Sequence, residues 1–483
     1  MLKKMAKENI SLSHLLILSL PVLAYSAADE QMCLGSVKSS HEPLHSWTAA
    51  LDEHDDVNGI ELVQVKGMKR ERTQKINTLI GKDESNRHLR HKANGMQKHM
   101  RLNTSDPLCG HSLSGVDDAA LLATLDDRRA KPGRASGSNS KLTVLRQQKI
   151  FIAACLHQSE EIFPNWTSEL VRLLVALMNS ENSANFFVSI YESGSLDGTV
   201  GYLLNLDRHL KFLGVPSKIV TGGIVRDERQ RIEFMADIRN KAMEPLRASP
   251  EAYDHVLWLN DVMFCADGVL QLLAHALPEK KGGFGADAVC GMDYFWDEFG
   301  EVSGKHGECL FYDRWISHDI AGNNFGNEKP FVRDTSDSPG PGNDKLEAGE
   351  PFQVFSCWNG MVAFDAKIFQ KQGLQFRSKR DQECPASEAE LIFRDMWNAG
   401  RGKVLVSPRA TSAYHERHFE LCARESQPFQ FDSAPPIKKW APKPETLRCC
   451  PLLPNQDFVE YKNCFTENLN TLQNKTSHSG TRS

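Results

Sequence analysis

Short apolar runs alternate along the middle of the chain with longer segments in which apolar residues recur every three or four positions. The short runs predict buried β-strands, at 150–155, 186–191, 218–220 and 255–259. The helical spacing predicts helices over 168–178, 199–213 and 231–246, the second of them stopped by Gly214. Because these elements alternate without hairpin turns, we expect an α/β fold with βαβ units and a mostly parallel sheet flanked by helices.

The pattern is weaker outside this region and divides the chain into four parts. Further strands are predicted at 286–292 and 403–406, ordered structure at 353–364, and a further helix at 387–399. We predict a single α/β domain over 147–422, with a Gly/Pro/Asp-rich insertion at about 322–350. A polar, irregular stem or linker covers 29–146, and a Pro-rich tail covers 423–483.

The N-terminal segment 1–28 has the three parts of a secretory signal. Lys3, Lys4 and Lys7 precede an apolar stretch at 15–24, and small residues follow at 26–28. Counted from Ile10 the stretch also fits a retained signal anchor, although a full membrane span needs about 20 apolar residues. Both interpretations place the domain in the secretory pathway, in the Golgi lumen or outside the cell, whereas a cytosolic N-terminal helix would not.

The composition limits the kinds of partner and the cysteine chemistry that we expect. The 483 residues carry a formal net charge of −5 and no long basic block, so nucleic acid is not an expected partner. Among the twelve cysteines, Cys155, Cys265 and Cys290 lie in or beside apolar runs, where we expect buried free thiols. Better candidates for disulfides lie in polar surroundings, at 384, 422, 449, 450 and 464.

The most informative chemistry lies at the end of the strand at 255–259. Asn260 and Asp261 follow this strand, and Arg239 and Asn240 lie on the preceding helix. Ligands of open α/β sheets bind at the carboxyl ends of the strands, so Asp261 is expected there, where a carboxylate holds Mn²⁺ or Mg²⁺ against a diphosphate. Arg239 would contact phosphate or ribose. The alternatives are a helix cap for 260–261 and a surface ion pair for Arg239.

Several ordered blocks make the chain resemble a known family. The matching blocks are 151–157, 159–160, 164–166, 188–194, 197–199, 213–216, 231–232, 239–240, 259–262, 264, 290, 293, 311–313, 356–360, 374, 376–377 and 387–388. Together these blocks resemble the fungal capsule-associated α-1,3-mannosyltransferases (glycosyltransferase family 69, the cryptococcal mannosyltransferase type). The sequence departs from that family at 389–393, where Ala-Glu-Leu-Ile-Phe replaces the usual Cys-Cys-Leu-Ile-His.

The resemblance implies a catalytic domain of the A-type glycosyltransferase fold over 147–422. It implies transfer of mannose from GDP-mannose to an oligosaccharide or polysaccharide acceptor, with an α-1,3 linkage, in cell-wall or capsule synthesis. An Asp-x-Asp motif is absent from the sequence, so Asn260 and Asp261 would form the metal site in its place. The membrane would be a partner only through the N-terminal segment.

The remaining candidate residues come from the same pattern of strand ends. His157 and Glu192 follow the first two strands and would contact the base or ribose; a satisfied histidine and an exposed turn carboxylate are the alternatives. Within the loop Trp358-Asn359-Gly360, the tryptophan would stack on a sugar, unless it is a core residue. Glu388 is the preferred carboxylate for the acceptor hydroxyl or the donor sugar. Weaker acidic candidates are Asp293 and Asp313.

Other classes fit less well. The glycine pattern at 283–288 enters a strand instead of leaving one, which excludes a dinucleotide-binding fingerprint. No two acids can be paired from the sequence as a glycoside hydrolase requires. A family member without catalysis, assisting polysaccharide assembly or export, remains the alternative.

Overall fold

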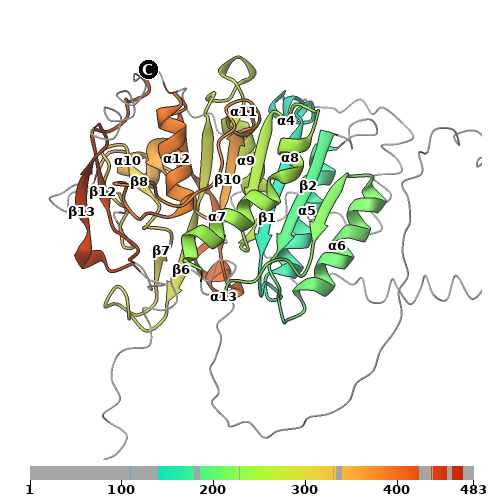
Figure 1. Ribbon diagram of the computed structural model, residues 1–483, viewed down its shortest axis with the longest axis horizontal. Coiled ribbons are helices and arrows are strands. Elements are labelled where there is room, and N and C mark those ends of the chain that lie inside the picture. Colours follow the sequence, from blue (N-terminus) through green and yellow to red (C-terminus); the bar gives the residue numbers. More distant parts are fainter. Residues whose placement is uncertain are drawn as a thin grey trace, which may run out of the picture. The chain divides into compact units, whose positions relative to one another are not determined.

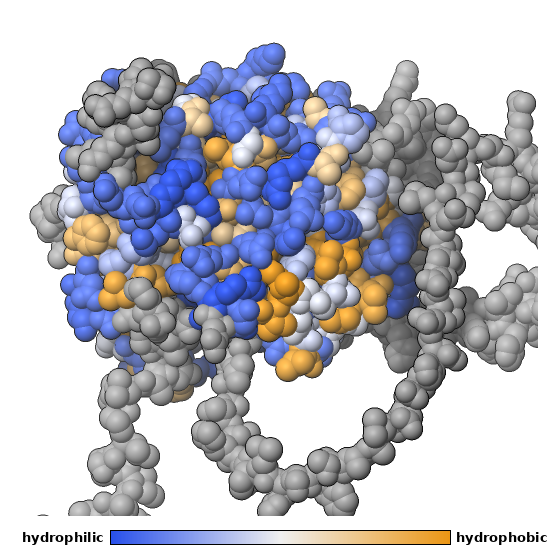
Figure 2. Space-filling view, viewed as in Figure 1, coloured by the Kyte–Doolittle hydropathy of each residue, from blue (hydrophilic) through white to orange (hydrophobic). Residues whose placement is uncertain are grey.

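The computed structural model describes residues 109, 140–178, 185–227, 229–329, 331–332, 340–423, 437, 439–453 and 459–470. The predicted signal or anchor at 1–28 and most of the predicted stem lie outside this part of the chain. None of the helices that the structure describes is long and apolar enough to cross a bilayer. Hydrophilic side chains cover much of the face shown in Figure 2, with patches of apolar ones between them.

An 11-stranded mixed sheet forms the centre of the domain, in the order β3-β2-β1-β4-β10-β6-β11-β9-β8 (Figure 1). The strands β1 (Ile150–Leu156), β2 (Phe186–Glu192), β3 (Ser217–Val220) and β4 (His255–Leu259) run parallel. β10 (Met361–Asp365) is antiparallel to both β4 and β6 (Ala288–Asp297), and β11 (Val404–Ala413) is parallel to β6. β9 (Phe352–Ser356) and β8 (His318–Asp319) close this edge, while β5 (Met263–Phe264) pairs with β11 and β7 (Glu308–Phe311) with β6. The predicted mostly parallel sheet is therefore confirmed.

Helices cover both faces of the sheet because successive strand residues point to opposite sides. One apolar cluster joins Ile150, Ile152 and Ala154 of β1 to α5 (Phe163–Leu177), α6 (Thr199–Leu213) and α9 (Ala266–Ala276). The other joins Phe151 and Ala153 to α7 (Arg231–Ala242), α8 (Glu244–Ala248), α11 (Lys367–Gln370) and α12 (Glu388–Asn398). Shorter helices complete the described chain: α4 (Ser140–Leu145), α10 (Asn343–Ala348), α13 (Glu416–His418), η3 (Glu279–Lys281), η4 (Phe419–Ala423) and η5 (Tyr461–Asn463).

The predicted elements differ from the observed ones mainly where the chain turns. α6 and β4 have the predicted bounds, whereas the helix predicted over 231–246 is divided at Met243, just before Pro245. The stretch at 353–364, where we expected ordered structure, forms β9 and β10, which are separated where the backbone turns through Asn359 (φ 53°) and Gly360 (φ 76°). Helix α9 was not predicted.

Five disulfides link described cysteines, and they correct part of the expectation. Cys265 pairs with Cys109 and Cys290 with Cys357, so neither is a free thiol. Their apolar neighbours indicated burial correctly but carried no information about a distant partner. Cys155 is free and buried, as predicted. The bridge candidates are all paired, in Cys309–Cys422, Cys384–Cys449 and Cys450–Cys464.

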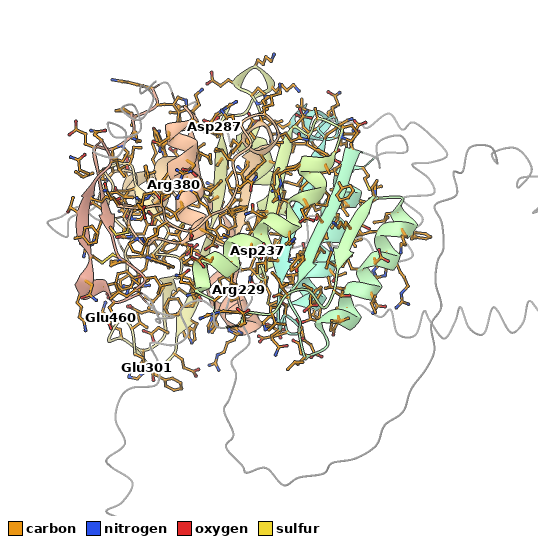
Figure 3. All side chains as sticks on the ribbon, viewed as in Figure 1. Arg229, Asp237, Asp287, Glu301, Arg380 and Glu460 are labelled. Carbon is orange, nitrogen blue, oxygen red and sulfur yellow. A yellow bond between two sulfur atoms is a disulfide. The ribbon has the colours of Figure 1, made fainter. Side chains whose placement is uncertain are left out.

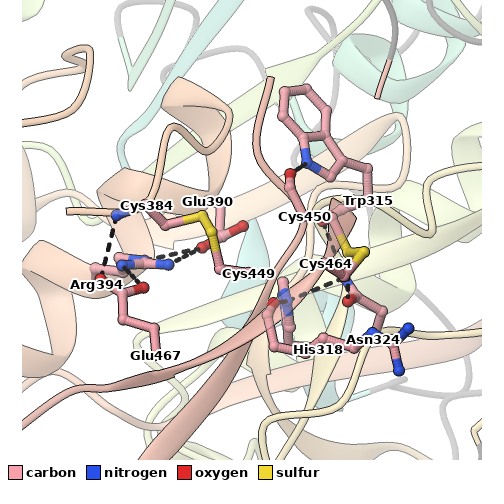
Figure 4. The surroundings of a disulfide bond; sticks show 11 residues. Trp315, His318, Asn324, Cys384, Glu390, Arg394, Cys449, Cys450, Cys464 and Glu467 are labelled. Carbon is pink, nitrogen blue, oxygen red and sulfur yellow. Dashed lines mark hydrogen bonds and ion pairs between the residues drawn. A yellow bond between two sulfur atoms is a disulfide. The ribbon is translucent and has the colours of Figure 1, made fainter. Parts of the chain in front are cut away.

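The folded unit extends beyond residue 422, where we predicted its end. β12 (Thr446–Cys449) and β13 (Phe465–Asn468) form an antiparallel hairpin, and Leu447 packs on Phe355 of β9. Figure 4 shows how Arg394 of α12 holds this hairpin through Glu467, beside the Cys384–Cys449 bridge. Pro-rich sequence has no periodicity, so only the cysteines could have indicated this attachment.

Candidate active site

Arg239 and Glu388 form an ion pair inside the domain. Nε of Arg239 donates to Oε1 of Glu388 over 2.8 Å, and the two residues are 1% and 2% exposed. The guanidinium carbon lies 4.4 Å from the ring centroid of Trp358 and 5.2 Å from that of Trp258. The predicted contacts of Arg239 with phosphate and of Glu388 with a sugar do not fit this arrangement, because each charge is buried and neutralised by the other.

The opposite face of α7 shows what an ordinary surface pair looks like in this protein. Arg229, just before the helix, lies 3.4 Å from Asp237, and both side chains are partly exposed (Figure 3). This pair matches the surface alternative that the sequence left open for Arg239. Arg239, which the sequence placed at the ligand-binding edge of the sheet, is buried instead.

Asn260 is the centre of the same buried network. Its Oδ1 accepts hydrogen bonds from the indole nitrogens of Trp258 (2.9 Å) and Trp358 (3.1 Å), and Nη1 of Arg239 lies at 3.5 Å. Its backbone oxygen accepts from the Trp166 indole, over 3.0 Å. An oxygen that faces three N–H donors, one of them cationic, does not suit a metal ion. The predicted metal ligation by Asn260 therefore does not fit the structure.

The loop 358–360 belongs to the core instead of the ligand edge. Trp358 is 0% exposed, so it has no free face for a sugar, and the core alternative holds. Asn359 is held by three hydrogen bonds: its backbone N–H donates to Oδ2 of Asp313, its Nδ2 to the Gly291 carbonyl, and its Oδ1 accepts from Ser317. At Gly360 a Cβ would lie 2.5 Å from Oγ of Ser412. Glycine is therefore required for close packing and for positive φ, not for approach to a ligand.

Asn240 also has a structural role. Its Nδ2 donates to the backbone oxygen of Phe376 over 2.7 Å, and its Oδ1 accepts from the Phe376 N–H over 3.2 Å. The side chain therefore fastens the segment before α12 onto α7. The predicted substrate contact of Asn240 does not fit this geometry, because both polar groups of its amide are used.

His157 and Glu192 lie where predicted, after β1 and at the end of β2. Glu192 is fully buried; its Oε2 accepts from the Gly222 N–H over 2.6 Å and its Oε1 from the Ser195 N–H. Glu192 thus holds the loops that follow β2 and β3 and is not an exposed turn residue. Nδ1 of the partly exposed His157 lies 2.9 Å from the Ser193 oxygen. Burial lowers the pKa of His157, so its imidazole is neutral at neutral pH. Their contacts with a nucleotide remain predictions.

Three carboxylates gather at the other side of β4. Asp261 follows β4, Asp293 lies in β6 and Asp313 follows β7, and they are 7%, 0% and 2% exposed. The Asp313 N–H donates to Oδ1 of Asp293 over 3.3 Å. Burial and these three carboxylates raise the pKa of Tyr414 well above its usual 10, so its phenol stays protonated.

Tyr414 and its neighbour Tyr312 are residues that sequence reasoning missed. Tyr414 follows β11, and the pairing of Ala413 with Met263 carries it alongside the Asp261 turn. Nδ2 of Asn260 donates to its hydroxyl over 3.4 Å. The signal for Tyr414 was its position directly after a strand; the signal for Tyr312 was the block at 311–313, in which only the aspartate was considered.

The carboxylate edge, formed by Asp261, Asp293 and Asp313, fits a metal ion that a diphosphate helps to bind. Mg²⁺ and Mn²⁺ in such sites need only one or two protein carboxylates, since phosphate and water oxygens complete the shell. Asp261 meets this requirement and Asn260 does not. Within the described ranges, the closest three-ligand group is Cys384, Cys449 and Glu467, but the two cysteines form a disulfide and Glu467 pairs with Arg394.

Comparison with known proteins decides the family. A family model described as Cryptococcal mannosyltransferase 1 matches residues 149–395, just over half of the chain. The chain belongs to this family. The observed sheet, with β10 reversed between β4 and β6, is accordingly the predicted A-type glycosyltransferase fold.

A characterised relative extends the match. Alpha-1,3-mannosyltransferase CMT1 of Cryptococcus neoformans var. neoformans serotype D is 29% identical over 316 residues, which cover 59% of this chain and 64% of the relative. The chain thus spans less than two thirds of the length of that mannosyltransferase.

Two solved structures match the chain at low similarity. The mannosyltransferase PcManGT from Pyrobaculum calidifontis, in complex with GDP-Man and Mn²⁺, has 9% identity and a TM-score of 0.30, over 61% of this chain and 66% of its own. Glucosyl-3-phosphoglycerate synthase from Mycobacterium tuberculosis, with Mn²⁺, UDP and glucosyl-3-phosphoglycerate, has 13% identity and a TM-score of 0.30, over 59% and 79%. No site assignment rests on these two structures.

Proposed function

We propose that this protein transfers mannose from GDP-mannose to a hydroxyl of a glycan acceptor, with an α-1,3 linkage and a divalent metal, Mn²⁺ or Mg²⁺. Family membership supports the reaction class, and the curated relative supports mannose and the linkage. The observation that carries the proposal is the position of Asp261. It follows β4, between the β1–β3 half of the sheet and the half that holds β6 and β11.

The two halves of the sheet would bind different parts of the substrates. Nucleotides bind outside the carboxyl ends of parallel strands, so the loops after β1, β2 and β3 are the expected cradle for the guanosine. Glu192 orders these loops through Gly222 and Ser195, and the neutral His157 lies at their rim. The buried Glu192 would therefore shape the pocket by ordering these loops.

Asp261 is the residue we propose to hold the metal at the diphosphate. When bound, the ion supplies positive charge that stabilises the departing nucleotide diphosphate. The protonated Tyr414 beside Asp261 offers a neutral hydroxyl at the same edge. Transfer from α-linked donor to α-linked product retains configuration, so a phosphate oxygen of the leaving group accepts the proton of the acceptor hydroxyl. A separate general base is then unnecessary.

We also propose that the protein works in the secretory pathway, in the Golgi lumen or after secretion. Five disulfides in the described chain favour an oxidising compartment. The signal-like pattern at 1–28 would provide the targeting or a membrane anchor.

The full chain should transfer mannose from GDP-mannose to mannose or mannobiose in the presence of Mn²⁺, and not glucose or xylose from their UDP donors. Asp261→Ala should reduce the transfer rate at least about 100-fold, since transition-state charge loses its stabilisation. Asp237→Ala, which removes an exposed carboxylate on α7, is the matched control and should leave the rate unchanged.

The outcomes separate the alternatives. Turnover of a different donor would keep the transferase and remove mannose. Failure of every donor to turn over, in a protein that is folded, would favour the helper without catalysis.

A further inference from the structure

Two tyrosines next to the carboxylates form an aromatic platform that no predicted role uses. The rings of Tyr312 and Tyr414 lie 4.7 Å apart between centroids, at an interplanar angle of 40°. Phe295 of β6 packs edge-on against Tyr312, at 6.0 Å. All three side chains are partly exposed, whereas Trp166, Trp258 and Trp358 are completely buried. The aromatic surface that solvent reaches at this edge is therefore this platform, and not the predicted tryptophan.

The main chain fixes the platform close to the three aspartates. The backbone N–H of Tyr312 donates to the backbone oxygen of Asp293 over 3.1 Å, and Asp313 is the residue after Tyr312. Tyr414 is placed by β5–β11 pairing beside Asp261, and its hydroxyl accepts from Asn260. An aromatic face suits a pyranose, whose C–H face packs on the rings.

The sheet order indicates which sugar lies there. β1, β2 and β3, whose loops are the proposed nucleotide cradle, lie on one side of β4. β6, β7 and β11, which carry the platform, lie on the other side, with Asp261 between the two halves. A sugar on the platform therefore approaches Asp261 from the side opposite the nucleotide.

We propose that Tyr312 and Tyr414 bind the terminal pyranose of the acceptor glycan by stacking, and that Tyr312 determines acceptor affinity. Calling this sugar the acceptor rests on the proposed transferase function. The binding itself needs no turnover, so it can be tested separately.

The test measures saccharide binding to the full chain in the presence of GDP and Mg²⁺, with methyl α-mannopyranoside and α-1,3-mannobiose as probes in saturation-transfer NMR and calorimetry. Tyr312→Ala should weaken the binding of the mannosides about fivefold to tenfold, the worth of one aromatic contact. Tyr312→Phe keeps the ring and should stay within about twofold of the unaltered protein. The affinity for GDP should not change in either variant.

Two further variants keep the test decisive. Tyr312→Leu retains apolar volume without a flat ring and replaces the alanine variant if that one does not fold. Tyr253 lies just before β4, at the opposite end of that strand from Asp261, and its ring packs on Phe151. Tyr253→Ala should therefore leave mannoside binding unchanged.

The proposal is overturned if Tyr312→Ala and Tyr312→Leu bind mannosides as the unaltered protein does, or if their affinity for GDP falls in parallel. It is also overturned if the unaltered protein binds neither probe. The proposed function then still stands or falls on donor turnover alone.

Discussion

Two groups of polar residues meet at the end of β4, and they are built in opposite ways. In the buried network, Arg239, Glu388 and Asn260 satisfy one another inside an aromatic enclosure. At the carboxylate edge, the buried Asp261, Asp293 and Asp313 lie close to Tyr414 and raise the pKa of its phenol. A paired charge stabilises a conformation, whereas buried acidic groups that perturb a neighbouring pKa are typical of sites that receive a cation or a ligand.

Asn260 and Asp261 are neighbours in sequence, yet one points into the network and the other belongs to the edge. The network therefore positions the turn that presents Asp261. We infer that Arg239 and Glu388 act on the reaction only through this turn.

Breaking the ion pair should give the largest change in stability. Arg239→Met leaves Glu388 buried without its partner and should lower the free energy of unfolding by about 3–5 kcal/mol. The double variant Arg239→Met/Glu388→Gln removes both charges and should recover a large part of that loss. Urea denaturation measures both effects. Equal stabilities of the single and double variants would contradict the assignment of a coupled buried pair.

Acidic pH should lower the stability of the fold through His255, at the opposite end of β4 from Asp261. Burial lowers the pKa of His255, the first residue of β4, from 6.5 to about 4. The unfolded chain regains the ordinary pKa and binds a proton that the folded imidazole does not, so stability is lost as the pH falls from 6.5 towards 4. At the lower end the loss is on the order of 3 kcal/mol.

Urea denaturation across this pH range measures that slope. His255→Leu should reduce the slope without abolishing it, because burial also lowers the pKa of His275 to about 3 and that of His418 to about 4. His306→Leu, at an exposed position, should leave the slope unchanged. An unchanged slope in His255→Leu would assign the acid sensitivity to other groups.

The sequence predicted the fold well because periodicity reports burial directly. β1, β4 and α6 follow from runs that are apolar on both faces or on one stripe. The same information cannot choose an inward face for α7, where apolar residues at 232, 234, 235, 236 and 238 surround the helix. Arg239 was therefore assigned to the ligand edge, although tertiary packing turns it inward.

The site was harder to predict because its parts come from distant segments. Asn260 is held by tryptophans at 166, 258 and 358, and no spacing in the sequence indicates that their indole groups converge. Asp261 was placed correctly after β4 since only the end of one strand was needed. Tyr414 reaches the same edge through a short antiparallel pairing that no periodicity shows.

The most direct test compares Asp261→Asn with Glu388→Gln, measuring for each the thermal midpoint of unfolding and the rate of mannosyl transfer as a function of Mn²⁺ concentration. We predict that Asp261→Asn keeps its thermal midpoint and loses transfer at least about 100-fold. Glu388→Gln leaves the Arg239 charge buried without its partner, so it should lose about 3–5 kcal/mol of stability and keep transfer with an unchanged Mn²⁺ requirement. The opposite result, full transfer by Asp261→Asn or an inactive but fully stable Glu388→Gln, would contradict the account and make Glu388 the group that acts on the sugar.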